Sequence, residues 1–129
     1  MNDPDFLTVE DVIQLHEESL IRYGGGSGIR DLGALESAVA MPQQSFGGQF
    51  VHEDLFAMAA AYAFHVAQNQ PFVDGNKRTG LAAALVFLDL NGTFVVDPEG
   101  KLYQALIDIA EHRLDKVGLA ELLRSLAAP

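Results

Sequence analysis

The sequence contains no cysteine and no tryptophan, and lysine and arginine together number eight among its 129 residues. Without cysteine the protein cannot form a disulfide, use a thiolate as a nucleophile or bind a metal through sulfur. Eighteen acidic residues give a net charge of −10, which opposes attraction to the phosphate backbones of DNA and RNA. We therefore expect no direct contact with nucleic acid and no attachment to an anionic membrane.

A long apolar run is also missing. The two longest apolar stretches, residues 55–67 and 81–90, are shorter than the ~18 residues that a bilayer span requires. The N-terminus does not show a basic region followed by an apolar one, so it does not resemble a secretory signal. We expect a cytoplasmic protein, and the chain length suits one domain over residues 1–129 with a single core.

Helical periodicity is what the sequence does contain. Apolar residues recur at helical spacing in several segments, which are bounded by capping residues or by glycine and proline. These segments are 8–23, 32–41, 52–69, 76–91, 102–109 and 119–126. Residues 43–51 lack a clean period and suit an ordered loop or short hairpin that could lie over a site as a flap. We predict an all-α fold, a compact single-domain bundle of about six helices with a short flap-like loop.

Residues 70–80, Gln-Pro-Phe-Val-Asp-Gly-Asn-Lys-Arg-Thr-Gly, carry the strongest functional signal. They join a glycine-containing loop to the start of a helix, and such a junction directs backbone N–H groups and the positive end of the helix dipole at an anion. Gly75 permits a left-handed backbone, and Lys77 and Arg78 add two positive charges to an acidic protein. The stretch therefore predicts a phosphate cradle that suits a nucleotide.

Two residues of this cradle have more than one interpretation. Asn76 can cap the helix or bind phosphate oxygens. Asp74 can neutralise Arg78 or hold Mg²⁺, and we favour the metal role because a carboxylate beside phosphates commonly binds that ion. A plain turn followed by a solvated helix start would use the same residue types, since Asp, Gly and Asn are frequent in turns.

The segment from Gln70 to Arg78 closely resembles the core motif of the Fic/Doc family, which runs His-X-Phe-X-(Asp/Glu)-Gly-Asn-(Gly/Lys)-Arg. The residues that agree with the motif are Phe72, Asp74, Gly75, Asn76, Lys77 and Arg78. Further agreement with the Doc (death-on-curing) branch extends over most of the chain, at 28–31, 35–38, Pro42, 61–64 and 88–92. The resemblance implies a bundle of about six helices, which agrees with the periodicity.

The resemblance also implies roles for the motif residues. Phe72 would be the buried anchor of the loop, Asp74 would hold Mg²⁺, and Gln70 would face the acceptor hydroxyl. The residues that would contact the phosphates of ATP, or of another nucleoside triphosphate, are Gly75, Asn76, Lys77 and Arg78. Gln70, Asp74, Lys77 and Arg78 would together occupy the catalytic positions.

Two positions place the sequence nearer to Doc than to the Fic enzymes that transfer AMP. Lys77 stands where those enzymes usually have Gly, and Leu81 stands where they carry a second Arg. In the family, the version with Lys goes with transfer of the terminal phosphate of ATP to a protein hydroxyl, the known Doc target being elongation factor Tu. The resemblance thus implies a kinase-like toxin with a Phd-type antitoxin as its partner. Transfer of AMP is the alternative activity.

Gln70 departs from the motif, because the family has a His there that accepts the proton of the attacking hydroxyl. A side-chain amide has no useful basicity, and loss of a positioned base typically lowers the rate ~10²–10⁴-fold. Three interpretations are open. The change inactivates an enzyme that still binds nucleotide, another base replaces the His, or the protein is a non-catalytic relative that binds nucleotide or antitoxin.

The four histidines offer no obvious replacement base. His65 is the nearest to the loop, but it lies within an apolar helical segment, where a packing role is more common. His52 suits a helix start, and we expect His16 and His112 at the surface. Their spacing does not match a zinc site.

Two features outside the motif have open roles. Arg30 can reach the site or a partner, or it can form a salt bridge with Asp31 or Glu36. The glycine-rich stretch 24–28 lacks the ending of a nucleotide-binding phosphate loop, so we expect a flexible connection there.

Overall fold

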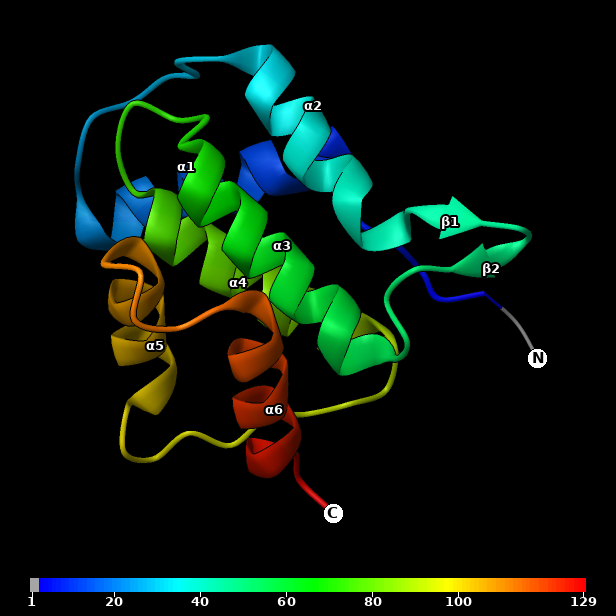
Figure 1. The fold of residues 1–129 in the computed structure, drawn as a ribbon. Helices are drawn as coiled ribbons and strands as arrows, with labels where there is room; N and C mark the ends of the chain where they lie inside the picture. The colour runs from blue at the N-terminus through cyan, green and yellow to red at the C-terminus, as the bar shows by residue number, and fades with distance from the viewer. Residues whose placement is uncertain (1–2) are drawn as a thin grey trace.

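The computed structural model describes residues 3–129, which form six α-helices, a 3-10 turn and a two-stranded hairpin (Figure 1). The helices are α1 (Val9–Tyr23), α2 (Leu32–Ala40), α3 (Leu55–Asn69), α4 (Asn76–Leu90), α5 (Lys101–Ala110) and α6 (Lys116–Leu126). The turn η1 (Met41–Gln43) precedes the antiparallel strands β1 (Ser45–Phe46) and β2 (Gln49–Phe50). The predicted all-α bundle is confirmed. None of the helices in residues 3–129 combines the length and the apolar character needed to cross a membrane.

Side chains that accept hydrogen bonds from backbone N–H groups fix where most of the helices begin. Thr8, Asp31, Asp54 and Asp115 each accept from the N–H three residues further along, at the starts of α1, α2, α3 and α6. At the start of α5, Asp97 accepts from the N–H groups of the first two helical residues. In the described part of the chain, α4 is the one α-helix in which no side chain accepts from a first-turn N–H group.

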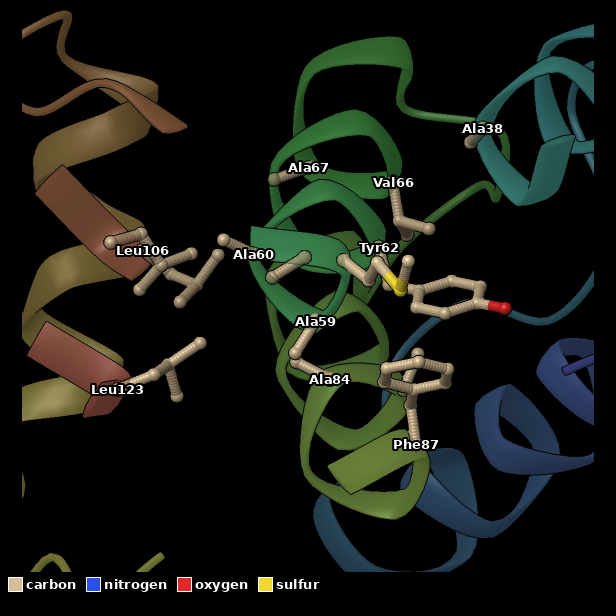
Figure 2. Packing of buried hydrophobic residues seen from close by; sticks show 14 of the residues in the cluster. Ala38, Ala59, Ala60, Tyr62, Val66, Ala67, Ala84, Phe87, Leu106 and Leu123 are labelled. Carbon is tan, nitrogen blue, oxygen red and sulfur yellow. The ribbon is translucent and has the colours of Figure 1, made fainter. Parts of the chain in front are cut away.

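Helix α3 lies at the centre of the core, and α2, α4, α5 and α6 pack against it. Figure 2 shows Leu106 of α5 and Leu123 of α6 pointing toward α3 from one side. On the other side the rings of Tyr62 and Phe87 lie 5.2 Å apart between centroids. The Tyr62 hydroxyl accepts a hydrogen bond from the Leu7 N–H, and burial raises the pKa of Tyr62 to about 12. The N-terminal segment is thereby tied to the core.

Helices α3 and α4 approach each other closely at Gly80. A Cβ atom on Gly80 would lie 2.8 Å from the carbonyl oxygen of Ala63, which is closer than atoms can pack without a shift of the backbone. Both residues are buried. Since Gly80 lies near the start of α4, this contact holds that start against α3 and helps to position the loop between the two helices.

The β1–β2 hairpin forms within the predicted loop at 43–51, but it does not cover the loop that joins α3 to α4. Figure 1 shows the hairpin beside the start of α3, whereas residues 70–75 follow the end of that helix. The 15 residues of α3 separate the two by roughly 22 Å. Phe50 packs against Phe6, while Phe46 is 86% exposed. The prediction of a hairpin is therefore right in form, but the hairpin is not a cover for this loop.

A polar pair joins α3 to α6. Lys116 Nζ lies 3.0 Å from His65 Nε2. Burial, followed by the positive charges of Lys116 and His52, lowers the pKa of His65 to about 4. His52 is itself buried, and burial together with Lys116 lowers its pKa. These contacts agree with the packing role that the sequence favoured for His65.

We expect Gly80→Ala to lower the free energy of unfolding by about 1–3 kcal/mol, because the new methyl group would strike the backbone of α3. Gly33→Ala is the matched control, since its Cβ would meet only the Asp31 carboxylate at 3.5 Å. That change in α2 should leave stability unchanged or raise it by up to about 1 kcal/mol. Urea unfolding followed by circular dichroism measures both. Wild-type stability in Gly80→Ala would contradict the close approach of the two helices.

We expect the protein to lose stability as the pH falls from 6.5 toward about 4. In this range the unfolded chain takes up a proton on His65 that the folded protein does not, so acid favours unfolding, and the full stability is present above the range. His65→Gln cannot take up that proton and should lose less stability, by about 1 kcal/mol after allowance for partial exposure of the ring. Urea unfolding at the two ends of the range gives the difference. Equal losses in both proteins would refute this account of His65.

Candidate active site

The candidate site begins with a reversal of the chain at Gln70, directly after α3. Gln70 has φ 47° and ψ 56°, in the left-handed region that a residue with a side chain adopts at a cost of about 1 kcal/mol or more. Its N–H donates to the carbonyl oxygen of Val66 at 3.1 Å, and its side chain is exposed. This reversal sends the chain into the loop at 71–75 that leads to α4.

Arg30 holds the reversal in place. Its Nε donates to the carbonyl oxygen of Gln70 at 2.8 Å, and its Nη2 donates to that oxygen and, at 3.0 Å, to the carbonyl oxygen of Asn69. A cation at the C-terminal end of α3 also interacts favourably with the helix dipole. The sequence left open a salt bridge between Arg30 and Asp31 or Glu36. That interpretation is wrong, because the Arg30 guanidinium donates its hydrogen bonds to backbone carbonyl oxygens instead.

The segment at 28–31 runs antiparallel to the loop and fixes its path. Both Arg30 N–H and Asp31 N–H donate to the carbonyl oxygen of Pro71, at 2.7 and 3.0 Å. Val73 N–H donates to the carbonyl oxygen of Gly28 at 3.1 Å, around an isolated bridge at 29 and 72. The two stretches that carry the family resemblance before α2 and before α4 thus meet in space.

Phe72 is the buried anchor of the loop, with 1% of its surface exposed. The ring of His16 stacks on it, with 3.9 Å between ring centroids and 7° between planes. His16 Nε2 lies 2.8 Å from the carbonyl oxygen of Asp74, to which it donates. The prediction of a surface position for His16 is wrong, since the residue is 3% exposed. It lies one helical turn after buried Val12, and that spacing was the signal that sequence reasoning missed.

The side chain of Asn76 closes the loop on itself. Its Oδ1 accepts from the N–H of Phe72 at 3.0 Å, and its Nδ2 donates to the carbonyl oxygen of Phe72 at 3.1 Å. Both polar atoms of the Asn76 side chain are therefore engaged with Phe72, whereas the sequence suggested that this side chain caps the helix or binds a phosphate. The group of Asn76 that is available to an anion is its backbone N–H.

Helix α4 opens at Gly75, which has φ 77° and ψ 20°. A glycine adopts this left-handed conformation without strain, and it brings no side chain that could accept from the first turn. The N–H groups at the start of any helix lack partners within the helix. Because α4 also lacks a side-chain cap, the N–H groups of residues 76–78 are available to an anion, and the helix dipole favours negative charge there.

Asp74 places an exposed carboxylate beside this helix start. Its Oδ2 accepts from the N–H of Gly26 at 3.2 Å, and its Oδ1 accepts from the N–H of Gly75 at 2.8 Å. These two hydrogen bonds lower the pKa of Asp74, so the group is ionised at neutral pH. Each oxygen keeps a further acceptor position.

Asp74 fits the requirements of Mg²⁺ when the ion arrives with phosphates. Such ions are usually held by one or two carboxylates together with phosphate oxygens and water. Among residues 3–129 there is no cluster of three or more His, Asp or Glu that would hold a metal without that help. The donor set therefore suits an ion that is shared with a polyphosphate.

The glycine-rich stretch at 24–28 passes over Asp74. A Cβ atom on Gly25, whose φ is 116°, would lie 2.8 Å from Asp74 Oδ2, and one on Gly26 would lie 3.2 Å from Val73. Glycine is therefore required for the close approach of this stretch to the loop. The segment that we expected to be only a flexible connection forms one wall of the candidate site.

The two cations of the motif have different surroundings. Lys77 is partly buried and takes part in none of the ion pairs formed by residues 3–129. The Arg78 guanidinium lies 4.4 Å from the ring centroid of Tyr23 and 5.2 Å from that of Tyr103. Arg78 thus contacts the aromatic rings of α1 and α5, which the sequence did not indicate. The side chains of Tyr23, Arg78 and Tyr103 line a groove of about 510 Å³ between α1, α4 and α5.

The arrangement can bind an anion and a cation, but it offers no proton acceptor at position 70. His16 lies under the loop with Nε2 committed to a carbonyl oxygen, and His65 is bonded to Lys116. His112 is exposed on the connection between α5 and α6. None of these contacts directs His16, His65 or His112 toward Gln70, so these three histidines do not supply the replacement base.

The residues of the candidate site lie within the part of the chain that is similar to known proteins. The family model described as the Fic/DOC family matches residues 6–88, which include His16, Arg30 and the whole loop from Gln70 to Arg78. The chain is 35% identical over 121 residues to the protein kinase doc of Escherichia phage P1, covering 93% of this chain and 94% of that protein. It is 42% identical over 88 residues to the toxin Doc of Mycolicibacterium smegmatis, covering 68% of this chain and 65% of that protein.

The matched family model spans more than half of the chain, and both relatives are similar well beyond the motif. The chain therefore belongs to the Fic/DOC family, as a relative of the Doc toxins.

Proposed function

We propose that the protein is the toxin of a type II toxin–antitoxin system and transfers the terminal phosphate of ATP to a hydroxyl group of a target protein. The observation that carries this proposal is the start of α4. It is the one α-helix start in residues 3–129 at which no side chain accepts from the first-turn N–H groups, and Lys77 and the ionised Asp74 lie beside it. A helix start of this kind suits the phosphates of a nucleotide.

In the proposed complex the backbone N–H groups of residues 76–78 and the side chain of Lys77 bind the phosphates of ATP. Asp74 provides one oxygen ligand to Mg²⁺, which would neutralise charge on the phosphates when bound. Arg78 joins them from its position beside Tyr23 and Tyr103. Phe72 keeps the loop attached to the core, and Arg30 holds Gln70 in place at the start of the loop.

Transfer of phosphate is favoured over transfer of AMP by two features of the chain. Lys77 and Leu81 replace the Gly and the second Arg that accompany AMP transfer in the family resemblance. In addition, a relative that is similar over nearly its whole length carries the name protein kinase. In the reaction an acceptor oxygen forms a bond to the γ-phosphorus, the bond to the bridging oxygen breaks, and ADP leaves.

Gln70 limits the rate of this reaction. The acceptor hydroxyl must give up a proton, and an amide cannot take it, so the proton passes to water. A loss of ~10²–10⁴-fold relative to a protein with a positioned base is expected. The same observation favours the second candidate function, in which the protein binds nucleotide or antitoxin in this site without transferring a group.

The partners that we propose are a Phd-type antitoxin and a protein substrate, for which elongation factor Tu is the first candidate to test. The apolar groove between α1, α4 and α5, with Arg78 on its wall, supports the antitoxin proposal because amphipathic segments dock into such grooves. We propose a cytoplasmic setting for these partners.

Labelled ATP tests the transferred group. With elongation factor Tu as acceptor, γ-labelled ATP should label the target and α-labelled ATP should not. Gln70→His should raise the rate ~10²–10⁴-fold, because imidazole accepts the proton. Gln70→Asn is the matched control, since Asn also tolerates the left-handed backbone but has no basicity.

Other outcomes of this experiment separate the alternatives. Transfer of the α-label would replace the phosphate proposal with AMP transfer. Failure of Gln70→His to transfer either label, with ATP still bound, would contradict the enzyme proposal and favour a binding role. An equal gain in Gln70→His and Gln70→Asn would show that the missing base is not the cause of slow transfer.

Binding of ATP tests the cradle itself. Lys77→Ala should weaken binding of Mg-ATP by about tenfold, which corresponds to a charge-assisted hydrogen bond of ~1.4 kcal/mol. Lys101→Ala is the control, because it removes the same charge from an exposed lysine that pairs with Glu99 on another part of the surface. Titration calorimetry measures both affinities. Equal affinities in the two variants would refute a role for Lys77 in the site.

A further inference from the structure

The peptide group that joins Asp74 to Gly75 lies directly before α4, and it is held from both sides. Its carbonyl oxygen accepts from His16 Nε2 at 2.8 Å. Its N–H, which belongs to Gly75, donates to Asp74 Oδ1 at 2.8 Å. Since the C=O and N–H of a trans peptide point in opposite directions, the carbonyl faces buried His16 and the N–H faces the exposed carboxylate. The positive side of this peptide is therefore the side that borders the anion position.

A rotation of this one peptide would reverse the arrangement. Types I and II of the β-turn differ mainly in such a rotation, and the residue after the peptide has φ of about −90° in type I and about +80° in type II. Gly75 has φ 77° and ψ 20°, which match the second of these conformations. Because glycine adopts both conformations without strain, Gly75 itself does not select between them. The orientation depends on the groups that hold the peptide.

The rotated peptide would close the site to an anion. Its carbonyl oxygen would lie on the side of the Asp74 carboxylate, where its negative end repels a phosphate, and its N–H would face the ring of His16. Two hydrogen bonds oppose this rotation. One comes from the carboxylate that the proposed function assigns to Mg²⁺. The other comes from His16, which is 3% exposed and lies out of reach of a ligand.

Packing fixes the direction of the His16 ring. The ring stacks on that of Phe72, with 3.9 Å between centroids and 7° between planes. The Asn76 side chain binds both the N–H and the carbonyl oxygen of Phe72, so Phe72 is fixed in turn. A Cβ atom on Gly75 would lie 3.8 Å from His16 Nε2, in ordinary van der Waals contact. The ring is therefore directed at the peptide by contacts that belong to the core and the loop.

We propose that His16 is a positioning residue of the candidate active site. By donating to the carbonyl oxygen of Asp74, it keeps the peptide between Asp74 and Gly75 in the orientation that admits an anion. This proposal rests on the proposed function for the identity of that anion, the phosphates of ATP. The role is distinct from the packing of His16 against Phe72, because it requires the donor on Nε2 and not the ring alone.

Two substitutions separate the donor from the ring. His16→Phe keeps a ring that can stack on Phe72 but has no donor, so the Asp74 carbonyl oxygen would face an apolar group. His16→Gln loses the stacking but keeps an N–H donor at the end of its side chain. Titration calorimetry should show Mg-ATP binding at least about fivefold weaker in His16→Phe, with most of the loss recovered in His16→Gln. Urea unfolding of both variants shows whether affinity merely follows stability.

Nuclear magnetic resonance of the nucleotide-free protein reads the peptide itself. In the wild type the His16 ring should carry a proton on Nε2, the atom that donates. In His16→Phe the amide proton of Gly75 should show a nuclear Overhauser effect to the ring at position 16 that the wild type lacks, because the rotated N–H faces that ring. Neither measurement uses ATP. This proposal can therefore fail while the proposed function stands, and the proposed function can fail while this proposal stands.

Four results would overturn the proposal. A wild-type ring protonated at Nδ1 and not at Nε2 cannot donate to the carbonyl oxygen. Wild-type affinity for Mg-ATP in folded His16→Phe would show that the hydrogen bond is dispensable, and a missing Overhauser effect would show that the peptide has not rotated. Affinities that follow stability in both variants would leave His16 with a packing role alone. If His16→Phe does not fold, the ring nitrogens of the wild type and the affinity of His16→Gln decide the question.

Discussion

The antiparallel contact between the segment at 28–31 and the loop after α3 is the constraint on which the rest of the site depends. A left-handed residue with a side chain at position 70 is unfavourable by itself, and Arg30 offsets the cost by donating to the carbonyl oxygens that the end of α3 leaves free. Two further backbone bonds to Pro71 fix the direction of the loop. The position of the start of α4 is thereby fixed, and no side chain caps its first N–H groups.

The distribution of charge and of helix caps sets the start of α4 apart from the rest of the protein. The protein carries a net charge of −10, and five of its six helices in residues 3–129 use an acidic or hydroxyl side chain to cap their first turns. At α4 a glycine stands in that place. A bound anion can therefore accept hydrogen bonds from the first N–H groups of α4, as Asp side chains do at other helix starts of the chain. The carboxylate of Asp74 is turned aside by two backbone N–H groups, so that it borders the anion position without filling it.

Much of this arrangement could be predicted from the sequence, because local rules govern it. Capping residues, glycine and proline mark the helix ends, and the motif indicates Phe72 as the anchor. Contacts between distant segments could not be predicted in this way. Arg30 binds carbonyls some 40 positions away, and Tyr103 meets Arg78 only because α5 folds back beside α4. The position of the hairpin likewise follows from the packing of the whole bundle, which residue type alone does not encode.

The most direct test of the account is a titration of the isotopically labelled protein with Mg-ATP, followed through its backbone amide resonances. The account predicts that the largest changes occur at Asn76, Lys77 and Arg78, whose N–H groups have no partner within α4. Changes confined to the groove beside Tyr103, or to the surroundings of Lys116, would contradict it. So would the absence of any change at ligand concentrations that saturate related nucleotide sites.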